Sequence, residues 1–169
     1  MELSLDMNYN QKAMTAMAKA MRVVLQAEQD KKSKIIAWIF IGLAAVILLT
    51  SQQVGWMQIA AGILVALFVL YLIFQDQVNG FLALKKLPEK MRSGVWLFRE
   101  DGYFSNTEAG ESDYSYQNIF AIVESEGYIF LVFHNGEAQI LELAAIKGGT
   151  ADDLRRLLRK KTSLTIQTG

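Results

Sequence analysis

The sequence predicts an α+β membrane protein, in which a two-helix transmembrane hairpin carries a cytoplasmic antiparallel β half-barrel capped by a C-terminal helix. Three observations lead to this fold class: two apolar runs with a short polar connector, basic residues on the outer flanks of both runs, and a second half rich in short strands and tight turns. Hydrophobic residues make up 52% of the 169 positions and charged residues 20%, so an anchor and an aqueous part share the chain.

The apolar runs cover residues 35–50 and 54–74, and residues 51–53 separate them. At 1.5 Å per residue the second run is roughly 31 Å long, the thickness of a bilayer's hydrocarbon core; the first is roughly 24 Å long and needs a longer helix or a thinner bilayer. A connector this short cannot cross a bilayer, so we expect a hairpin with one external turn. The alternative is a buried helical pair in a soluble bundle, but such helices normally show a polar stripe, and these runs show none.

Basic residues set the predicted orientation of the hairpin. They are Lys12, Lys19, Arg22, Lys31, Lys32 and Lys34 before the first run, and Lys85, Lys86, Lys90 and Arg92 after the second. The connector carries no basic residue. Because basic flanks stay on the cytoplasmic side, both termini are predicted to be cytoplasmic.

Residues 1–34 show two different periods. Leu3, Leu5 and Met7 alternate with polar residues, which predicts a short strand that must pair with an edge of the later sheet. From about Tyr9, apolar residues recur every three or four positions, which predicts an amphipathic helix that continues into the membrane because no Pro or Gly intervenes. Its methionine stripe is more typical of packing than of an adaptable binding surface.

Residues 75–93 are predicted to form a cytoplasmic helical stalk and linker. Val78, Phe81 and Leu82 lie on one side of this helix, and Pro88 ends it. The stalk and the N-terminal helix leave the membrane side by side, so we expect their apolar stripes to pair.

Residues 94–169 are predicted to form one β domain. Segments rich in aromatic and β-branched residues lie at 95–99, 103–107, 113–123, 128–133 and 138–143. Turns containing Asp-Gly and Asn-Gly separate them, which predicts a five-stranded antiparallel meander. Thr150 then caps a helix with acids in its first turn and bases in its last. A curved sheet closed by one helix is the outline of a pleckstrin-homology-like half-barrel.

Two strands of this sheet carry positional signals. The run 113–123 turns apolar on both faces in its second half, which predicts a central strand. The segment 138–143 alternates only in part and precedes a Gly-Gly link, which predicts an exposed edge. Residues 164–168 fit either a frayed tail or one more short strand.

This layout resembles a known family through two short motifs. Phe98-Arg99-Glu100-Asp101-Gly102 and Tyr116-x-x-Ile119-x-x-Ile122-x-Glu124, behind a strand, a helix and two transmembrane helices, resemble the bacterial YcxB-like proteins. The resemblance implies a multi-pass protein of the bacterial inner membrane with a pleckstrin-homology-like domain, core positions for Phe98 and Ile119, and no catalytic residues. One segment departs from it, since an Ile-Pro-Lys-like stretch is replaced by Leu143-Ala144-Ala145-Ile146-Lys147.

No motif for catalysis, cofactor binding or metal binding is found. The chain has no cysteine, and no phosphate loop, zinc spacing or nucleophile elbow occurs. His134 lies in a His-Asn-Gly turn, where a solvated loop residue is the ordinary interpretation. The apolar runs contain no Asp, Glu, Lys, Arg or His, which argues against a transporter. We therefore expect neither an enzyme nor a carrier, with no cofactor and, at zero net charge, no nucleic acid partner.

Two surfaces are candidates for contacts. The first is the basic face of the last helix, a candidate for contact with lipid or a partner. Its residues are Arg155, Arg156, Arg159, Lys160 and Lys161. The competing interpretation is the ordinary basic last turn of a helix. Gly62 and Ala66 form a small-xxx-small pair that can seat another helix. Trp38 and Trp56 fit interfacial anchors.

Two functions fit these features. The preferred hypothesis is a membrane-anchored interaction module that sits in the lipid bilayer and contacts a protein partner, or a second copy in a homo-oligomer, through its cytoplasmic domain. The alternative is an immunity protein against a bacteriocin or membrane-acting toxin, which a toxin or secretion gene beside this one would favour. Any lipid association through the basic helix is expected to weaken as salt rises.

Overall fold

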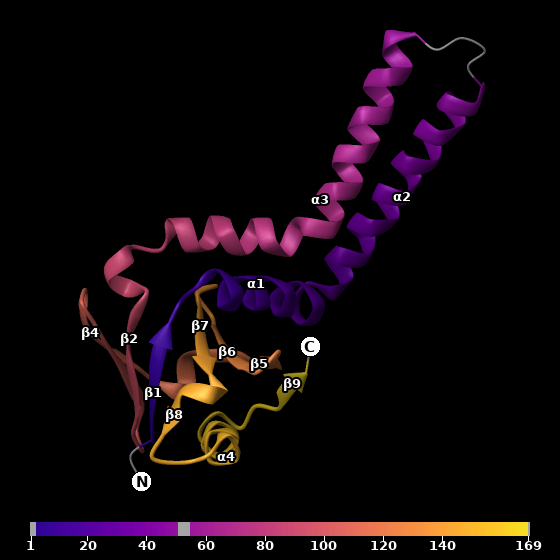
Figure 1. The fold of residues 1–169 in the computed structure, drawn as a ribbon. Coiled ribbons are helices and arrows are strands. Elements are labelled where there is room, and N and C mark those ends of the chain that lie inside the picture. Colours follow the sequence, from indigo (N-terminus) through magenta and orange to yellow (C-terminus); the bar gives the residue numbers. More distant parts are fainter. Residues whose placement is uncertain (1–2, 51–54, 169) are drawn as a thin grey trace.

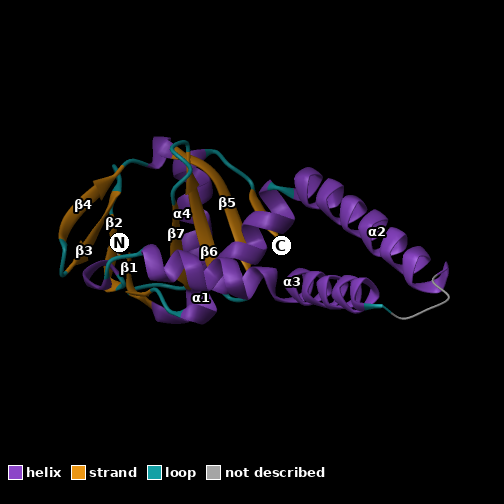
Figure 2. Ribbon diagram, turned by 90° about the horizontal axis from the view of Figure 1, so that it is seen from above, coloured by secondary structure: helices purple, strands orange, loops and turns teal. Residues whose placement is uncertain are grey.

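The computed structural model describes residues 3–50 and 55–168, so the predicted external turn at 51–53 lies outside the described residues. The chain forms a β domain built from two sheets, and two long helices extend away from it (Figure 1). Seen from above, the two sheets and the C-terminal helix lie together, and the long helices leave from one side (Figure 2). The α+β class predicted from the sequence is therefore confirmed.

The first helices are separated by a change of direction. Helix α1 spans Gln11–Ala20, a π-helical turn spans Met21–Leu25, and α2 spans Ala27–Thr50. At Gln26 the backbone leaves the α region, with φ −114° and ψ 19°. The expectation that the N-terminal helix runs without interruption into the apolar run is therefore wrong, although neither Pro nor Gly causes the break.

Helix α3 spans Trp56–Lys86, first beside α2 and then, after a bend, along α1 (Figure 1). The bent part approaches α1 closely at Gly80, where an added Cβ atom would lie 2.7 Å from the backbone nitrogen of Thr15. The predicted side-by-side arrangement of the two helices is thus observed, but Val78, Phe81 and Leu82 do not mediate it because all three are exposed. A short 3-10 turn, Glu89–Met91, leads into the β domain.

The first sheet has the strand order β4-β3-β2-β1-β8, and all its pairings are antiparallel. Its strands are β1 (Leu3–Asn8), β2 (Ser93–Phe98), β3 (Tyr103–Thr107), β4 (Gly110–Tyr114) and β8 (Ile146–Lys147). The predicted pairing of the N-terminal strand is confirmed. Strand β1 is internal, with Leu5 opposite Trp96 on one side and Ile146 on the other.

The second sheet has the order β7-β6-β5-β9. Its strands are β5 (Ile119–Ser125), β6 (Tyr128–Phe133), β7 (Ala138–Glu142) and β9 (Ile166–Thr168). Strand β9 pairs with β5 in parallel, so the end of the chain is a strand and not a frayed tail. Strand β7 lies at an end of the order, as predicted for an edge, and β5 is internal, as predicted for a central strand.

The prediction of a single five-stranded meander is wrong, because the run 113–123 does not form one strand. A 3-10 turn at Tyr116–Asn118 breaks it, and the chain passes there from the first sheet to the second. The Ser115 hydroxyl accepts a hydrogen bond from the Gln117 amide at 3.3 Å, a local bond that competes with strand pairing. The second half is also not buried throughout, since Phe120 is exposed.

The core lies between the sheets and is closed by α4 (Ala151–Thr162). Phe98 and Ile119 are buried there, as the resemblance implied. Leu154 and Leu158 are the buried residues of α4. The helix begins with a capping box, in which the Thr150 hydroxyl accepts from the Asp153 amide at 3.2 Å and the Asp153 carboxylate accepts from the Thr150 amide at 2.9 Å.

A second apolar cluster fixes α1 on the outer face of the second sheet. Met14 and Ala16 of α1 pack there with Phe130 of β6 and Ile140 of β7. Ala83 of α3 packs against the same cluster. The methionine stripe therefore serves packing, and α1 lies between the β domain and the bent part of α3.

Candidate membrane-contact site

The apolar side chains of α2 and of the first part of α3 lie outside the core. Trp56 is 79% exposed and Leu64 is 67% exposed. Among the described residues, one helical segment, 58–86, is long and apolar enough to cross a membrane by length and composition, and none of its most apolar window is buried in the chain. A core helix of a soluble protein would show the opposite pattern.

The two long helices are not packed tightly on each other. A cavity of about 580 Å³ lies between them, with Phe40 and Ala44 of α2 and Leu64 and Phe68 of α3 among its lining residues. An added Cβ atom on Gly62 would meet nothing within 4 Å, so Gly62 is not in contact with α2. The candidate pair Gly62 and Ala66 therefore does not serve packing between α2 and α3.

A cluster of charges lies where the helices change direction. Arg22 donates two hydrogen bonds to Asp76, from Nε to Oδ1 at 2.9 Å and from Nη2 to Oδ2 at 2.7 Å. Its Nη1 donates to Oδ2 of Asp30 at 3.1 Å. Lys34 forms an ion pair with the same Oδ2 atom of Asp30 at 2.7 Å. The side chains of Arg22, Asp30 and Asp76 are only 19%, 14% and 15% exposed, so these charges are shielded from water and neutralise each other.

The electrostatics of this cluster follow from its hydrogen bonds. The hydrogen bonds to Asp76 raise the pKa of Arg22 above its usual value, against the opposing effect of burial. Burial alone would raise the pKa of Asp30, but the Lys34 hydrogen bond and the Arg22 charge outweigh it and lower that pKa. The charges of the cluster pair with one another, and they act as a clamp that joins the π-helical turn after α1 to α2 and α3.

Sequence reasoning missed this clamp. From the sequence, Arg22 is one of the charges that set topology, and Asp30 and Asp76 have no predicted role. One signal was present, because Asp30 precedes the first apolar run by five residues and Asp76 follows the second by two. A pair of carboxylates at the same end of a hairpin calls for a nearby cation.

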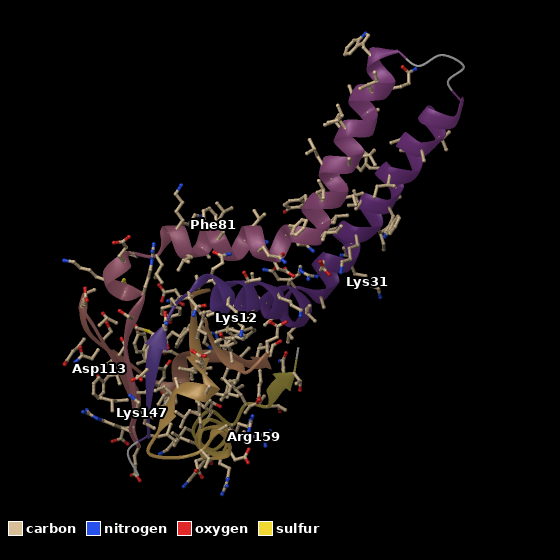
Figure 3. The ribbon with its side chains drawn as sticks, viewed as in Figure 1. Lys12, Lys31, Phe81, Asp113, Lys147 and Arg159 are labelled. Carbon is tan, nitrogen blue, oxygen red and sulfur yellow. The ribbon has the colours of Figure 1, made fainter. Side chains whose placement is uncertain are left out.

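The basic surface of α4 is smaller than its sequence indicates. Arg155 is committed to Glu124 of β5 by two hydrogen bonds of 2.9 and 2.6 Å. Arg156 forms an ion pair with Asp153 at 3.7 Å. Within residues 3–50 and 55–168, no ion pair involves Arg159, Lys160 or Lys161. These three cations lie at the end of the molecule opposite to α2 and the first part of α3, as the position of Arg159 shows (Figure 3).

A cavity of about 560 Å³ lies beside the first sheet, between β4, β7 and α1. Met14, Tyr9 and Trp96 contribute apolar walls, and Gln139 contributes a polar group. The Oε1 atom of Gln139 accepts a hydrogen bond from the Tyr103 hydroxyl at 2.6 Å. Burial raises the pKa of both tyrosines well above the usual range. Sequence reasoning had no signal for this cavity, which depends on how the two sheets face each other.

The described residues hold no group of three His, Asp or Glu side chains that could bind a metal ion. His134 is exposed at the end of β6, where its ring meets that of Phe120 edge-on at 5.4 Å. This exposed position fits the interpretation of a solvated turn residue.

Comparisons with known proteins bear on one part of the chain. No curated protein matches it. A solved structure of the Spt16D Pob3N heterodimer is similar over 45% of this chain and 45% of that chain, with 15% identity and a TM-score of 0.32, so the chain spans less than half the length of that structure. The family model for YcxB-like proteins matches residues 98–158, from the end of β2 to the buried Leu158 of α4. The resemblance seen in the sequence is thereby confirmed, and this segment of the chain is YcxB-like.

Proposed function

We propose that this protein is a non-enzymatic membrane-anchored interaction module. In this proposal, residues 35–50 of α2 and the first part of α3 are two transmembrane spans of the bacterial inner membrane, and the β domain is a pleckstrin-homology-like module at its cytoplasmic face. The module binds a protein partner or a second copy of the chain. The observation that carries the proposal is the exposure of apolar side chains along both helices, such as Phe40 and Leu64.

The exposed apolar side chains of these helices favour a lipid environment over water. Each Leu, Ile or Phe side chain that leaves water gains about 1.5–3 kcal/mol when it is fully buried. The long helices carry many such side chains without burying them in the chain. Contiguous apolar surface of this extent marks a membrane or a partner interface, and a span length of apolar residues favours the membrane.

The arrangement of the termini supports an even number of spans. Strand β1 near the start of the chain and strand β9 near its end both belong to the β domain. A chain that leaves this domain through α2 and returns through α3 has to cross the bilayer twice or not at all. The lysines at the base of α2, Lys31 among them (Figure 3), support a cytoplasmic position for the domain.

The open sheet edge at β4 supports a role in protein binding. Strand β4 ends the order of the first sheet, and its residues from Gly110 to Asp113 are exposed. A free edge can accept a strand from a partner through main-chain hydrogen bonds. The outer side of β7 is less free, because the Ile140 amide already donates to the Tyr9 hydroxyl at 3.4 Å.

Reporter fusions test the topology. A periplasm-active phosphatase inserted at residues 51–53 is expected to be active, while a fluorescent protein fused after Gly169 is expected to fluoresce in the cytoplasm. An inactive phosphatase at 51–53, with fluorescence from a fluorescent protein inserted at the same position, would overturn the proposal, because the connector would then lie on the same side as the β domain.

Cysteine crosslinking in native membranes tests the second-copy version. The chain has no cysteine, so single substitutions report without background. Ala66→Cys lies on the exposed face of α3, and Ala61→Cys, which lines the cavity toward α2, is the matched control. Oxidation is expected to give a dimer with Ala66→Cys alone. If both variants remain monomeric, the homo-oligomer version of the proposal is wrong, and binding to a different protein remains.

A further inference from the structure

The last third of α3 carries an exposed apolar stripe that no part of the described chain covers. Val78, Phe81, Leu82 and Lys85 follow the spacing i, i+3, i+4, i+7, so they lie on one face of the helix. All four are exposed. We propose that residues 75–86 form an in-plane helix that lies on the cytoplasmic leaflet and inserts this face into the lipid surface.

The opposite face of the same segment is already occupied. Gly80 touches the backbone of α1 at Thr15, and Ala83 and Leu84 pack against the cluster between α1 and the second sheet. The segment is therefore held rigidly on the β domain by one face while it presents the other. In a soluble protein the larger apolar side chains of a helix normally face the core. In this segment Val78, Phe81 and Leu82 are exposed, and Gly80 is on the packed face.

The helix is too long to lie entirely in a bilayer core. Its 31 residues correspond to roughly 46 Å, whereas a hydrocarbon core is about 30 Å thick. The apolar sequence is interrupted at Gln75, Asp76 and Gln77, and the clamp to Arg22 holds Asp76 there. The helix thus leaves the bilayer core near this point, and the remainder lies outside it.

The direction of the remainder points to the lipid surface. After its bend, α3 runs across the direction of the two proposed spans. Helix α1 lies below this part of α3, on the side away from the spans (Figure 1). Phe81 lies on the side of α3 that faces away from α1, which is the side from which the spans project (Figure 3). A bilayer that holds the spans therefore covers this face without any rearrangement of the chain.

Charges around the stripe match an anionic membrane surface. Lys85 and Lys86 follow it on α3, and Lys31 and Lys32 lie at the base of α2. Apolar side chains with lysines at their border are the composition of helices that lie in the interface and are attracted to anionic lipids. Continuity with the spans and this charge favour lipid over a protein as the occupant.

Depth measurements on the full-length protein test this inference, which rests on the proposed membrane anchoring. Single-cysteine variants Leu64→Cys, Phe81→Cys and Phe120→Cys carry a nitroxide label in vesicles of phosphatidylcholine and phosphatidylglycerol. Phe120 of β5 is the matched control, since it is 55% exposed and Phe81 is 54% exposed. Collisions with oxygen report lipid, and collisions with a nickel chelate report water.

The expected order of depth is Leu64 in the core, Phe81 roughly 5–10 Å into the headgroup and acyl boundary, and Phe120 in water. If Phe81 matches Phe120 while Leu64 is deep, the in-plane helix is wrong and the anchor stands; a protein partner is then the remaining occupant of the stripe. Equal depth of Phe81 and Leu64 also overturns the in-plane arrangement. If Leu64 is in water, the proposed anchoring itself fails and the inference fails with it.

Discussion

Arg22 and Asp76 form a two-bond ion pair that joins positions 54 residues apart, the first just after α1 and the second within α3. It closes the end of the hairpin that lies nearest the β domain. Because Asp30 shares the same guanidinium, one arginine neutralises carboxylates from two helices. This group joins α3 to the π-helical turn at Met21–Leu25.

Arg22→Met is expected to lower the free energy of unfolding by about 2 kcal/mol, because it leaves two shielded carboxylates without their partner. Thermal unfolding of the full chain in detergent measures the loss. Arg22→Lys keeps the charge but not the two-bond geometry, and we expect an intermediate value. Combining Arg22→Met with Asp76→Leu should recover part of the loss. An unchanged melting temperature for Arg22→Met would show that the clamp contributes nothing.

Acid is expected to weaken the contribution of Asp30. Its pKa is lowered in the folded chain, so its stabilising effect is complete above the ordinary value of about 3.9 and is lost as pH falls through the lower folded value. The difference in melting temperature between the unaltered chain and Asp30→Asn should therefore shrink between pH 5 and pH 3. Arg22 and Lys34 stay charged throughout this range. A constant difference would contradict the assignment.

Gly80→Ala is expected to separate α1 from α3. The added methyl group would lie 2.7 Å from a backbone atom of Thr15, which cannot move aside alone, and such overpacking costs about 1–3 kcal/mol. Gly62→Ala is the control, because open space surrounds that position and alanine favours the helix by up to about 1 kcal/mol. Equal melting temperatures for the two variants would argue against the close approach at Gly80.

Arginines of α4 are expected to separate into two classes. Arg155→Gln removes the two hydrogen bonds to Glu124 and should lower the free energy of unfolding by about 1–2 kcal/mol. Arg159→Gln should change it by less than about 0.5 kcal/mol, since the residue is exposed and unpaired within the described part of the chain. Urea unfolding followed by tryptophan fluorescence, with Trp38 and Trp56 replaced by Phe so that Trp96 alone reports, distinguishes the classes. If Arg159→Gln is the more damaging variant, the assignment is reversed.

Leu5→Ala is expected to cost about 2–5 kcal/mol, because the side chain is fully buried in the centre of the first sheet. Asp6→Ala on the same strand is the control. Its ion pair with Lys147 is solvent-exposed, so the cost should stay below about 1 kcal/mol. Limited proteolysis of the β domain provides a second measurement, and protection of the Leu5→Ala variant equal to that of Asp6→Ala would exclude a core role for β1.

Local patterns predicted much of this fold because each reports on one element. The alternation of Leu3, Leu5 and Met7 predicted β1, and Thr150 with its following acids predicted α4. The break within 113–123 was missed because Tyr116 and Asn118 are compatible with a strand, and the break depends on a contact far along the chain. The Tyr116 hydroxyl donates to the backbone carbonyl of Arg99 at 3.0 Å.

The basic face of α4 and the apolar stripe of α3 were predicted less well, because the contacts of each depend on residues that other elements supply. A basic helix face can be recognised from spacing, but the commitment of Arg155 depends on Glu124, which another strand supplies. The apolar stripe of α3 was recognised in the sequence, but its expected contact with α1 is wrong because the stripe is exposed. Spacing places Val78, Phe81 and Leu82 on one face, whereas Gly80 decides which face meets α1, since the smallest side chain allows the closest approach.

The internal position of β1 sets the order in which the molecule can be completed during synthesis. Strand β1 leaves the ribosome before either long helix, and its neighbours β2 and β8 leave after both. The first strand must therefore wait unpaired while the hairpin is made. Residues 93–168 expressed alone, without residues 3–8, would expose the edge of β2 and lack three core side chains, Leu3, Leu5 and Met7. Strand β1 and the later strands β2 and β8 thus complete one sheet, and a useful truncation must keep the first strand attached.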